Sequence, residues 1–476
     1  MEYINTFNTT AEYNAAKTSD TYGRPHVSLV LDNDGIHYEV DNRLIAKYNI
    51  ADISNNTKLL DKTSAFTEME IDGVKQPSVI SAYTFDTLGE HIVKYTLVDE
   101  TSMGASSFNT CYTLDSITIP DNVTTIGNYS FYYCRSLTSI TISKNVTSIG
   151  SNAFQGCSGV TSFVIPSGMT NIPSNAFTEC TSLTSVTIPD SVTSIGLGAF
   201  SGCSSLTSID IPERVTTIGS YAFGSCNGLT NITLPSSVTS IGGSAFRLCS
   251  GITSFVIGKN VTSIGTNVFE GCINLNSIVV NEENTVYDSR NNCNAIIQTA
   301  TNKLIQGCNN STIPNTVTSI NQQAFVGSNI QSIIIPSNVT SIGLSAFFGC
   351  KRLSSVTIEN GLTTLGPQAF LGCVSLTSII IPNSVTTIDD GALMSCSGLT
   401  SVTIGNGVTS ISNQAFSDCS NLTSITCNAM TAPTFDDWST FYGIGNNGTL
   451  YVPQGSSGYD GWMSSHSFSG WTKVEQ

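Results

Sequence analysis

The sequence is poor in charge of either sign, because only 11% of its 476 residues are Asp, Glu, Lys or Arg. That share is less than half of the rough quarter that is usual in a soluble domain. The 18 basic residues form no cluster and are outnumbered by 34 acidic residues, which gives a formal net charge of -16. Proteins that neutralise phosphates need clustered Lys and Arg, so we expect neither nucleic acid nor an anionic membrane surface as a partner.

Histidine is scarce as well, and none of the four histidines lies between His91 and His466. The central part of the chain therefore has no Cys–His or Ser–His pair, and its many serines have no base to activate them. Gly-rich phosphate loops, paired zinc-type cysteines and EF-hand loops are missing from the sequence. We expect no enzymatic activity, no metal and no cofactor, and the paired acids at 282–283 and 389–390 fit solvated turns.

Long apolar runs are also missing. No stretch of about 18 apolar residues occurs, so we expect no insertion into a membrane. The opening Met1-Glu-Tyr-Ile-Asn-Thr has neither the basic nor the apolar segment of a secretory signal. A cell-surface, extracellular or virion location is favoured, and it requires another export route or a leader outside this sequence.

What the sequence does contain is a repeat of 23 residues, which is marked by one aromatic residue in each unit. The marker residues are Phe108, Phe131, Phe154, Phe177, Phe200, Phe223, Phe246 and Phe269, then, after an irregular stretch, Phe325, Phe347, Phe370, Leu393 and Phe416. Steps in the first series are all 23 residues, and those in the second are 22, 23, 23 and 23. A unit of this size cannot bury its own apolar face, so the units must stack into a solenoid.

One unit, residues 183–203, shows the pattern within a coil. Apolar and polar residues alternate around Val186, which predicts a short strand, and Pro189 ends it because proline cannot donate to a β-ladder. A second apolar pair predicts another short extended stretch, after which Gly196 allows a tight turn. Phe200 then follows on a short helical turn and points into the core.

Twelve of the fifteen cysteines lie three residues after a marker position. They are Cys111, Cys134, Cys157, Cys180, Cys203, Cys226, Cys249, Cys272, Cys350, Cys373, Cys396 and Cys419. Free cysteine packs as a small hydrophobic residue and is among the most buried residue types. The strict spacing offers one cysteine per coil rather than two close pairs, so we expect a ladder of reduced thiols and not a metal site.

The motif Leu-Thr-Ser-Ile-Thr-Ile-Pro-x-x-Val-Thr-Ser-Ile-Gly-x-x-Ala-Phe-x-x-Cys resembles the BspA-type (Treponema pallidum-type) leucine-rich repeats of bacterial surface proteins. The resemblance covers residues 99–427. It implies adhesion to host matrix proteins or other cells, but it carries no residue-level binding motif. We therefore expect a repeat solenoid: a leucine-rich-repeat right-handed coil with short parallel β-strands, short helical turns and about fourteen coils, plus a small N-terminal β module.

Residues 276–324 interrupt the rhythm, with an insertion near 281–310. The segment 292–308 predicts a β-hairpin that turns at 300–301. The expected cross-strand partners are Ile296 with Ile305, Ile297 with Leu304, and Cys293 with Cys308. Opposed cysteines permit a disulfide, although we favour reduced thiols. The hairpin is read as a tolerated structural variant, and the alternative is a binding protrusion.

Outside the repeats we expect a β-rich module with an attachment segment at 1–98 and a C-terminal cap at 428–476. Residues 24–31 and 35–40 predict strands around a turn at 32–35, and residues 81–97 predict two more strands of a sandwich-like module that caps the first coil. Residues 3–40 resemble the opening segments of proteins from gut Bacteroidales and their phages, which implies attachment. In the C-terminal cap Trp438, Trp462 and Trp471 cover the last coil, or alternatively one of them stacks on a sugar.

The face formed by the predicted strands is the best candidate binding surface. A serine recurs at its first outward position, and the residue two places later varies. The candidate binding residues are Thr187, Asp210, Thr233, Val256, Val279, Ile334, Thr357 and Ile380. We expect a non-catalytic, monomeric scaffold that binds a protein or glycan on a host or neighbouring cell. The alternative function of the chain is a structural spacer or fibre component of a cell surface or phage virion. The alternative interpretation of the face is that its residues serve only strand formation and solubility.

Overall fold

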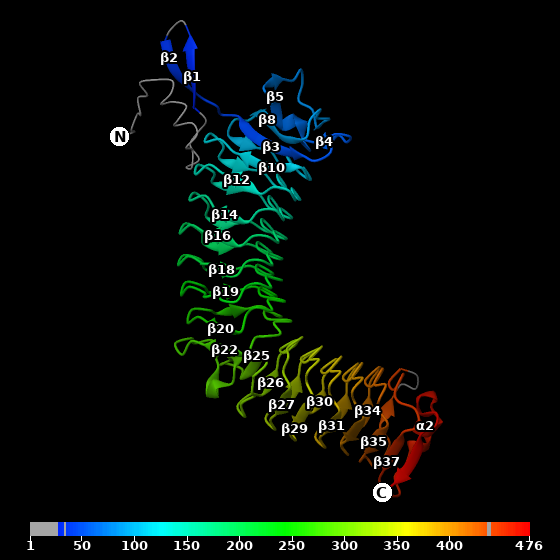
Figure 1. Cartoon of the computed structure of the whole chain (residues 1–476). Coiled ribbons are helices and arrows are strands. Elements are labelled where there is room, and N and C mark those ends of the chain that lie inside the picture. Colours follow the sequence, from blue (N-terminus) through cyan, green and yellow to red (C-terminus); the bar gives the residue numbers. More distant parts are fainter. Residues whose placement is uncertain (1–26, 33–34, 436–438) are drawn as a thin grey trace. The chain divides into compact units, whose positions relative to one another are not determined.

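The computed structural model describes residues 27–32, 35–435 and 439–476. The chain divides into two compact units, one of residues 1–161 and 166–169 and the other of residues 162–165 and 170–476. In both units short strands of successive coils pair in parallel, as the labelled strands of Figure 1 show. The predicted fold class, a solenoid with an N-terminal β module, is confirmed.

The described part of the first unit begins with the predicted antiparallel hairpin of β1 (Val27–Asp32) and β2 (Gly35–Val40). The turn residues 33–34 and the predicted attachment segment before residue 27 lie outside the described residues. A six-stranded sheet follows in the order β12-β10-β3-β8-β5-β6. Its strands are β3 (Leu44–Ile50), β5 (Phe66–Ile71), β6 (Val74–Lys75), β8 (Gly89–Leu97), β10 (Leu114–Thr118) and β12 (Ser139–Thr141). The remaining elements are β4 (Thr57–Lys58), η1 (Thr63–Ala65), β7 (Ala82–Tyr83), β9 (Ser102–Met103), β11 (Thr125–Ile126) and β13 (Ser148–Ile149).

The N-terminal module covers the first coil by continuing its sheet. Strand β3 pairs in antiparallel fashion with β10, the strand of the first coil. The rings of Phe66 and Tyr95 lie 5.9 and 5.4 Å from the ring of Phe108, the first marker residue. The two strands predicted within 81–97 are present as β7 and β8, but they do not pair with each other, because β7 pairs with β4 and β8 lies in the six-stranded sheet.

The second unit contains two rows of strands. The first row starts at the repeat serine and consists of β14 (Ser162–Val164), β16 (Ser185–Thr187), β20 (Ser254–Ile257), β22 (Ser277–Val280), β27 (Ser332–Ile335), β29 (Ser355–Ile358), β31 (Ser378–Ile381), β33 (Ser401–Ile404) and β35 (Ser424–Cys427). We call the outward side of this row the strand face. The second row is β15 (Asn171–Ile172), β17 (Ser194–Ile195), β18 (Thr217–Ile218), β19 (Ser240–Ile241), β21 (Ser263–Ile264), β26 (Ser319–Ile320), β28 (Ser341–Ile342), β30 (Thr364–Leu365), β32 (Thr387–Ile388), β34 (Ser410–Ile411) and β36 (Thr434–Phe435).

The second row is the more continuous one, although its strands are only two residues long. It forms a five-stranded sheet from β15 to β21 and most of a nine-stranded sheet that ends at β36. Gly196, for which we predicted a tight turn, lies directly after β17. An ideal Cβ on this glycine would meet the Ile172 carbonyl oxygen of the preceding coil at 2.7 Å, so close stacking of the coils explains the glycine.

The turns that carry the marker residues are hydrogen-bonded turns and not the predicted short helical turns. Gly198, two residues before Phe200, has a left-handed φ of 59°, which a continuing right-handed helix does not accept. The Gly198 N–H donates to the Ser220 carbonyl at 2.8 Å, and the Phe200 N–H donates to the Ala222 carbonyl at 2.8 Å. Because these donors bond to the next coil, they are not available for bonds within a helix.

The marker rings stack along the core. In the second unit the rings of Phe177, Phe200, Phe223 and Phe246 follow one another at 5.4, 5.6 and 5.5 Å, with interplanar angles of 10° or less. The rings of Phe347 and Phe370 lie 5.0 Å apart in a later coil. All these side chains are buried, which is the arrangement that the equal spacing predicts.

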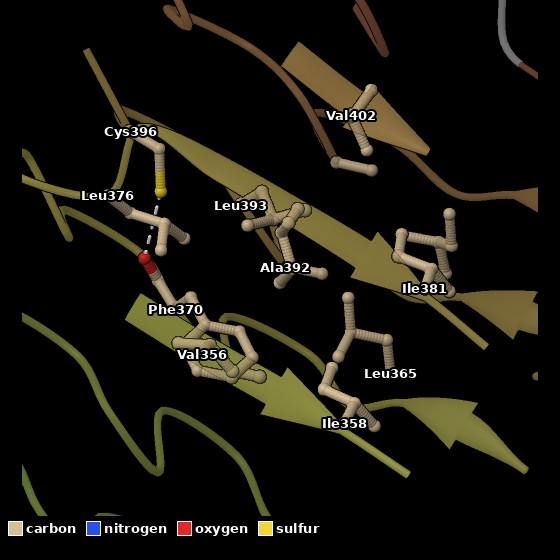
Figure 2. Close-up of a cluster of buried hydrophobic side chains, with 14 of the residues drawn as sticks. Val356, Ile358, Leu365, Phe370, Leu376, Ile381, Ala392, Leu393, Cys396 and Val402 are labelled. Carbon is tan, nitrogen blue, oxygen red and sulfur yellow. Dashed lines mark hydrogen bonds between the residues drawn. The ribbon is translucent and has the colours of Figure 1, made fainter. Parts of the chain in front are cut away.

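The predicted thiol ladder is present, and it is hydrogen-bonded. Ten cysteines donate to the backbone carbonyl of the marker residue in the preceding coil at 2.9–3.3 Å: Cys134, Cys157, Cys203, Cys226, Cys249, Cys272, Cys350, Cys373, Cys396 and Cys419. Figure 2 shows one of these bonds, from Cys396 to Phe370, among buried aliphatic side chains. Each thiol therefore links two coils as well as filling space.

The insertion adds β23 (Tyr287–Asp288), η2 (Arg290–Asn292), β24 (Ala295–Gln298) and β25 (Lys303–Gly307). Strands β24 and β25 form the predicted hairpin, and Ile297 faces Leu304 as expected. Ile296 faces Gln306 instead of Ile305, because a β-bulge shifts the register by one residue. Strand β25 also pairs in parallel with β26, so the hairpin is part of the second row, which fits a structural variant better than a protrusion.

The same bulge separates the two cysteines that we expected to face each other. Ala295 pairs with Gly307, and the Cys308 thiol donates to the Asn294 carbonyl at 3.2 Å. The Cys293 thiol instead lies 3.7 Å from the Ala295 carbonyl. Both are buried free thiols in the structure.

The C-terminal segment adds two further rungs to the first row, β37 (Thr449–Val452) and β38 (Thr472–Glu475), so the solenoid has about 16 turns. The ring of Phe441 stacks on that of Phe416 at 5.1 Å and so continues the marker row. Around it lie α2 (Tyr459–Ser464) and η3 (His466–Phe468). Trp462 and Trp471 are buried, so neither is free to stack on a sugar, and Trp438 lies outside the described residues.

Candidate binding surface

All eight residues predicted for the strand face lie in the second unit and are exposed. They point outward because they alternate with buried residues of the same strands, as in β20, where Phe255 and Ile257 are buried and Val256 is exposed. The aliphatic members are substantially solvent-accessible: Val256 is 56% exposed, Val279 47%, Ile334 58% and Ile380 65%. Val164, in the same position of β14, is 69% exposed and was not among the predicted residues.

The structure brings some of these residues together as direct neighbours. Val256 and Val279 are register partners on β20 and β22, and Ile334 and Thr357 are partners on β27 and β29. Ile380 instead pairs with Thr403. The predicted face therefore consists of short patches in which an exposed aliphatic side chain lies beside another or beside a threonine.

Asp210 and Thr233 lie where the first row is interrupted. Their coils share only a single bridge between Ser208 and Asn231. Asp and Asn are depleted in strands, and these two coils carry Asp210 and Asn231 at strand positions. Together with Glu213 they line a shallow hollow of about 200 Å³ on the strand face. A uniform row of strands was thus expected but is not formed here.

A second possible contact surface, in the first unit, escaped the sequence analysis. Tyr112 and Tyr129 are 51% and 44% exposed, and Tyr132 and Tyr133 lie next to each other with ring centroids 4.6 Å apart. The Arg135 guanidinium lies 5.6 Å from the Tyr112 ring and 5.1 Å from the Tyr133 ring. Tyrosine and arginine are enriched at interaction hot spots. The sequence marks this surface by four tyrosines at turn positions where most other coils carry small or polar residues.

The cysteine thiols within the coils are buried and held in an unreactive state. Burial raises the pKa of the Cys134, Cys249, Cys350 and Cys396 thiols to about 12, so they stay protonated at neutral pH. A protonated thiol is neither a nucleophile nor a good metal ligand. Across the residues that the structure describes, no three His, Cys, Asp or Glu side chains gather into a metal site.

His91 lies on β8 in the N-terminal module and has defined hydrogen-bond partners. Its Nδ1 lies 2.7 Å from Asp72 Oδ2 and its Nε2 lies 2.9 Å from the Thr87 carbonyl oxygen. Burial lowers the pKa of His91, but the bonds to Asp72 and Thr87 outweigh burial and raise it above its ordinary value. The centroid of the His91 ring lies 4.2 Å from that of the Phe85 ring, within the module's own packing. These contacts fit a structural role.

No helix in the described part of the chain combines the length and the apolar character needed to cross a bilayer.

Comparison with known proteins gives a consistent result. The model of the BspA type leucine-rich repeat region matches residues 101–200, 170–297 and 305–423, which together exceed half of the chain. A leucine-rich cell surface protein from Faecalibacterium prausnitzii is 34% identical, with a TM-score of 0.53 over 70% of this chain and 84% of that one. No curated protein matches the chain significantly.

Two further solved structures are more distant. The pneumococcal vaccine antigen PcpA is 18% identical, with a TM-score of 0.52 over 80% of this chain and 85% of that chain, and shares the fold. A leucine-rich-repeat protein from Bacteroides ovatus is 24% identical, with a TM-score of 0.46 over 83% of this chain and 90% of that one.

Proposed function

Because the chain belongs to the BspA-type leucine-rich-repeat family, we propose that it is a non-catalytic adhesion scaffold at a cell surface. The scaffold binds a protein or glycan on a host or neighbouring cell through the strand face. A cell-surface location is supported by the F. prausnitzii relative, which is described as a cell surface protein. The partner itself is not identified by any of these relatives.

The observation that carries this proposal is the exposure of aliphatic side chains in registered strands. Val256 and Val279 stand side by side on parallel strands, where neighbouring backbones are about 4.8 Å apart. Both are roughly half exposed, and serine and threonine hydroxyls surround them. An apolar patch with a polar rim is typical of a surface that binds another macromolecule. The low charge of this face favours a partner that is recognised by shape and hydroxyl contacts.

A non-catalytic role is supported by the chemistry of the coils. Their thiols are buried and protonated, and the sequence contains no histidine between His91 and His466 to activate the serines of these coils. Catalysis needs convergent acid, base or nucleophilic groups. The repeated side chains instead supply a large, uniform contact area.

Binding of the fluorescently labelled full chain to epithelial cells, to a panel of matrix proteins and to a glycan array tests the proposal. Val256→Asp and Ile334→Asp place a charge in two of these patches, and each should weaken binding about tenfold or more, because an unpaired charge is desolvated on contact. Leu344→Asp is the matched control. Leu344 is 44% exposed and follows β28, outside the strand face, so the same charge there should leave binding unchanged.

If Leu344→Asp weakens binding as much as Val256→Asp does, the strand face is not the contact surface. If the unmodified chain binds none of the three targets, a spacer or fibre component becomes the better explanation. The variants change only exposed positions, so their thermal melting should match that of the unmodified chain.

A further inference from the structure

A hollow interrupts the strand face between β22 and β27, and its origin can be read from the sequence. In a regular coil Ile211 follows Cys203 by eight residues, whereas Ile313 follows Cys308 by only five. The shortening falls in the stretch that supplies the strand of the first row in other coils, and residues 308–318 contain no strand. The first row therefore lacks one rung, and space opens where that rung would lie.

The hollow has a volume of about 620 Å³, within the range of about 300–1,000 Å³ that is usual for small-molecule sites. It is lined by Ile273, Asn274, Asn276, Asn309, Asn310, Ser311, Thr312, Asn329, Gln331, Ser332 and Arg352. Six of these residues carry side-chain amides and three carry hydroxyls. The lining includes no carboxylate, and its one charged group is the Arg352 guanidinium.

Part of the amide lining is held in place by hydrogen bonds. Asn309 Nδ2 donates to the Ile273 carbonyl at 2.9 Å and to Asn276 Oδ1 at 3.1 Å. Asn309 Oδ1 accepts from the Asn329 N–H at 2.8 Å, and Asn329 Nδ2 donates to the same Ile273 carbonyl at 2.9 Å. These bonds join three successive coils, so the floor of the hollow is formed before any ligand arrives.

Other lining groups have no partner and are available to a ligand. Within the part of the chain that the structure describes, the side chains of Asn310, Gln331 and Arg352 make no hydrogen bond, and Arg352 makes no ion pair. All three are exposed. The Asn276 amide uses its oxygen on Asn309, which leaves its Nδ2 free to donate.

We propose that this hollow binds an acidic saccharide. A guanidinium binds a carboxylate through two parallel hydrogen bonds, and Arg352 is the group placed to do so. Amides both donate and accept, which matches the paired donor and acceptor character of neighbouring sugar hydroxyls. Ile273, 43% exposed at the rim, offers an apolar contact to the C–H face of a sugar ring.

The charge distribution of the chain supports an anionic ligand at this place. With a net charge of -16, most of the surface repels an anion, whereas the hollow combines an unpaired arginine with the absence of any lining carboxylate. This site goes beyond the strand-face proposal, because it concerns a small ligand and neither Val256 nor Ile334 lines it. Either proposal can therefore fail without the other.

Isothermal titration calorimetry of the full chain tests the site with a galacturonic acid trisaccharide as the probe. A galactose trisaccharide, sodium sulfate and a peptide of three glutamates are titrated in parallel. We expect binding of the acidic trisaccharide to exceed that of the neutral one, of sulfate and of the peptide. Arg352→Gln should weaken it about tenfold or more, since the charge-assisted bonds are lost.

Lys351→Gln is the matched control, because Lys351 is exposed, adjacent and equally charged but does not line the hollow. It should change the affinity by about twofold or less, since exposed charges are screened. Gln331→Ala tests the amide contribution without a change in charge and should also weaken binding. Val256→Asp should leave saccharide binding intact.

Several results would overturn the proposal. Equal affinity for the neutral trisaccharide would remove the role of Arg352, and equal affinity for sulfate would reduce the hollow to a general anion site. Tighter binding of the glutamate peptide would indicate a protein ligand instead. Unchanged affinity of Arg352→Gln, with normal thermal melting, would place any saccharide elsewhere on the chain.

Discussion

Removal of one ring from the marker row should loosen the solenoid locally and by a calculable amount. Phe223 is fully buried, and its ring lies 5.6 Å from that of Phe200 and 5.5 Å from that of Phe246. Replacement of a buried Phe by Ala costs about 3–5 kcal/mol. Each lost ring contact contributes about 0.5–1.5 kcal/mol beyond the buried area, so Phe223→Ala should lie near the upper end of that range. Phe223→Leu should cost only about 1.5 kcal/mol, because leucine keeps most of the volume.

The leucine variant is a natural control, since Leu393 occupies the same position in a later coil and is fully buried. Stacked repeats contact mainly their neighbours, and long arrays lose two-state behaviour, so hydrogen exchange measured peptide by peptide is the suitable assay. Exchange should accelerate in peptides from 198–250 in Phe223→Ala, less so in Phe223→Leu, and stay unchanged beyond 330. Equal protection in both variants, or a uniform loss along the whole chain, would refute the stacking argument.

Three further predictions concern protonation, thiols and close packing. The raised pKa of His91 stabilises the N-terminal module below the ordinary pKa of histidine, and this contribution is lost as the pH rises through the raised value. The hydrogen-exchange protection factors of β8, which are corrected for the intrinsic pH dependence of exchange, should therefore be lower at pH 8 than at about pH 5.5. His91→Gln should abolish that difference, and an unchanged difference would exclude the Asp72 contact as its cause. All fifteen cysteines are buried, so a thiol reagent at neutral pH should label almost no thiols in the native chain and fifteen thiols after denaturation without reductant. A count of thirteen thiols after denaturation would indicate a bond between Cys293 and Cys308. Rapid labelling of the native chain would contradict the thiol ladder. An ideal Cβ on Gly307 would lie 2.0 Å from the Phe325 ring, so Gly307→Ala should lower stability by about 1–3 kcal/mol in thermal melting. Gly461→Ala is the control and should not lower stability, because an ideal Cβ on Gly461 meets nothing within 4 Å. Equal melting of both variants would show that the Phe325 ring can shift.

Much of the fold could be derived from spacing because a solenoid repeats one local environment. Equal steps place each marker residue against the same residue of the next coil, so the buried rings, the thiol row and the parallel strands all follow from the period. The outward direction of Val256 and Ile380 follows equally from alternation within a strand. Even Asp210, which interrupts the first row, is predictable as exposed, because the residues on either side of it are apolar.

The rest depended on where individual backbone groups find their partners. The marker turns are not helices because their N–H groups donate across coils, and the bulge at Ile296 moved Cys308 away from Cys293, although both segments read correctly as strands. The shortened stretch after Cys308 is visible in the sequence, but only the stacking of its neighbours turns three missing residues into a hollow. Periodicity alone thus determined which side chains are buried and which face outward, because that choice is made inside each coil. Tertiary structure decided which outward residues become neighbours and where a rung is missing, because those outcomes depend on hydrogen bonds between coils that are distant in the sequence.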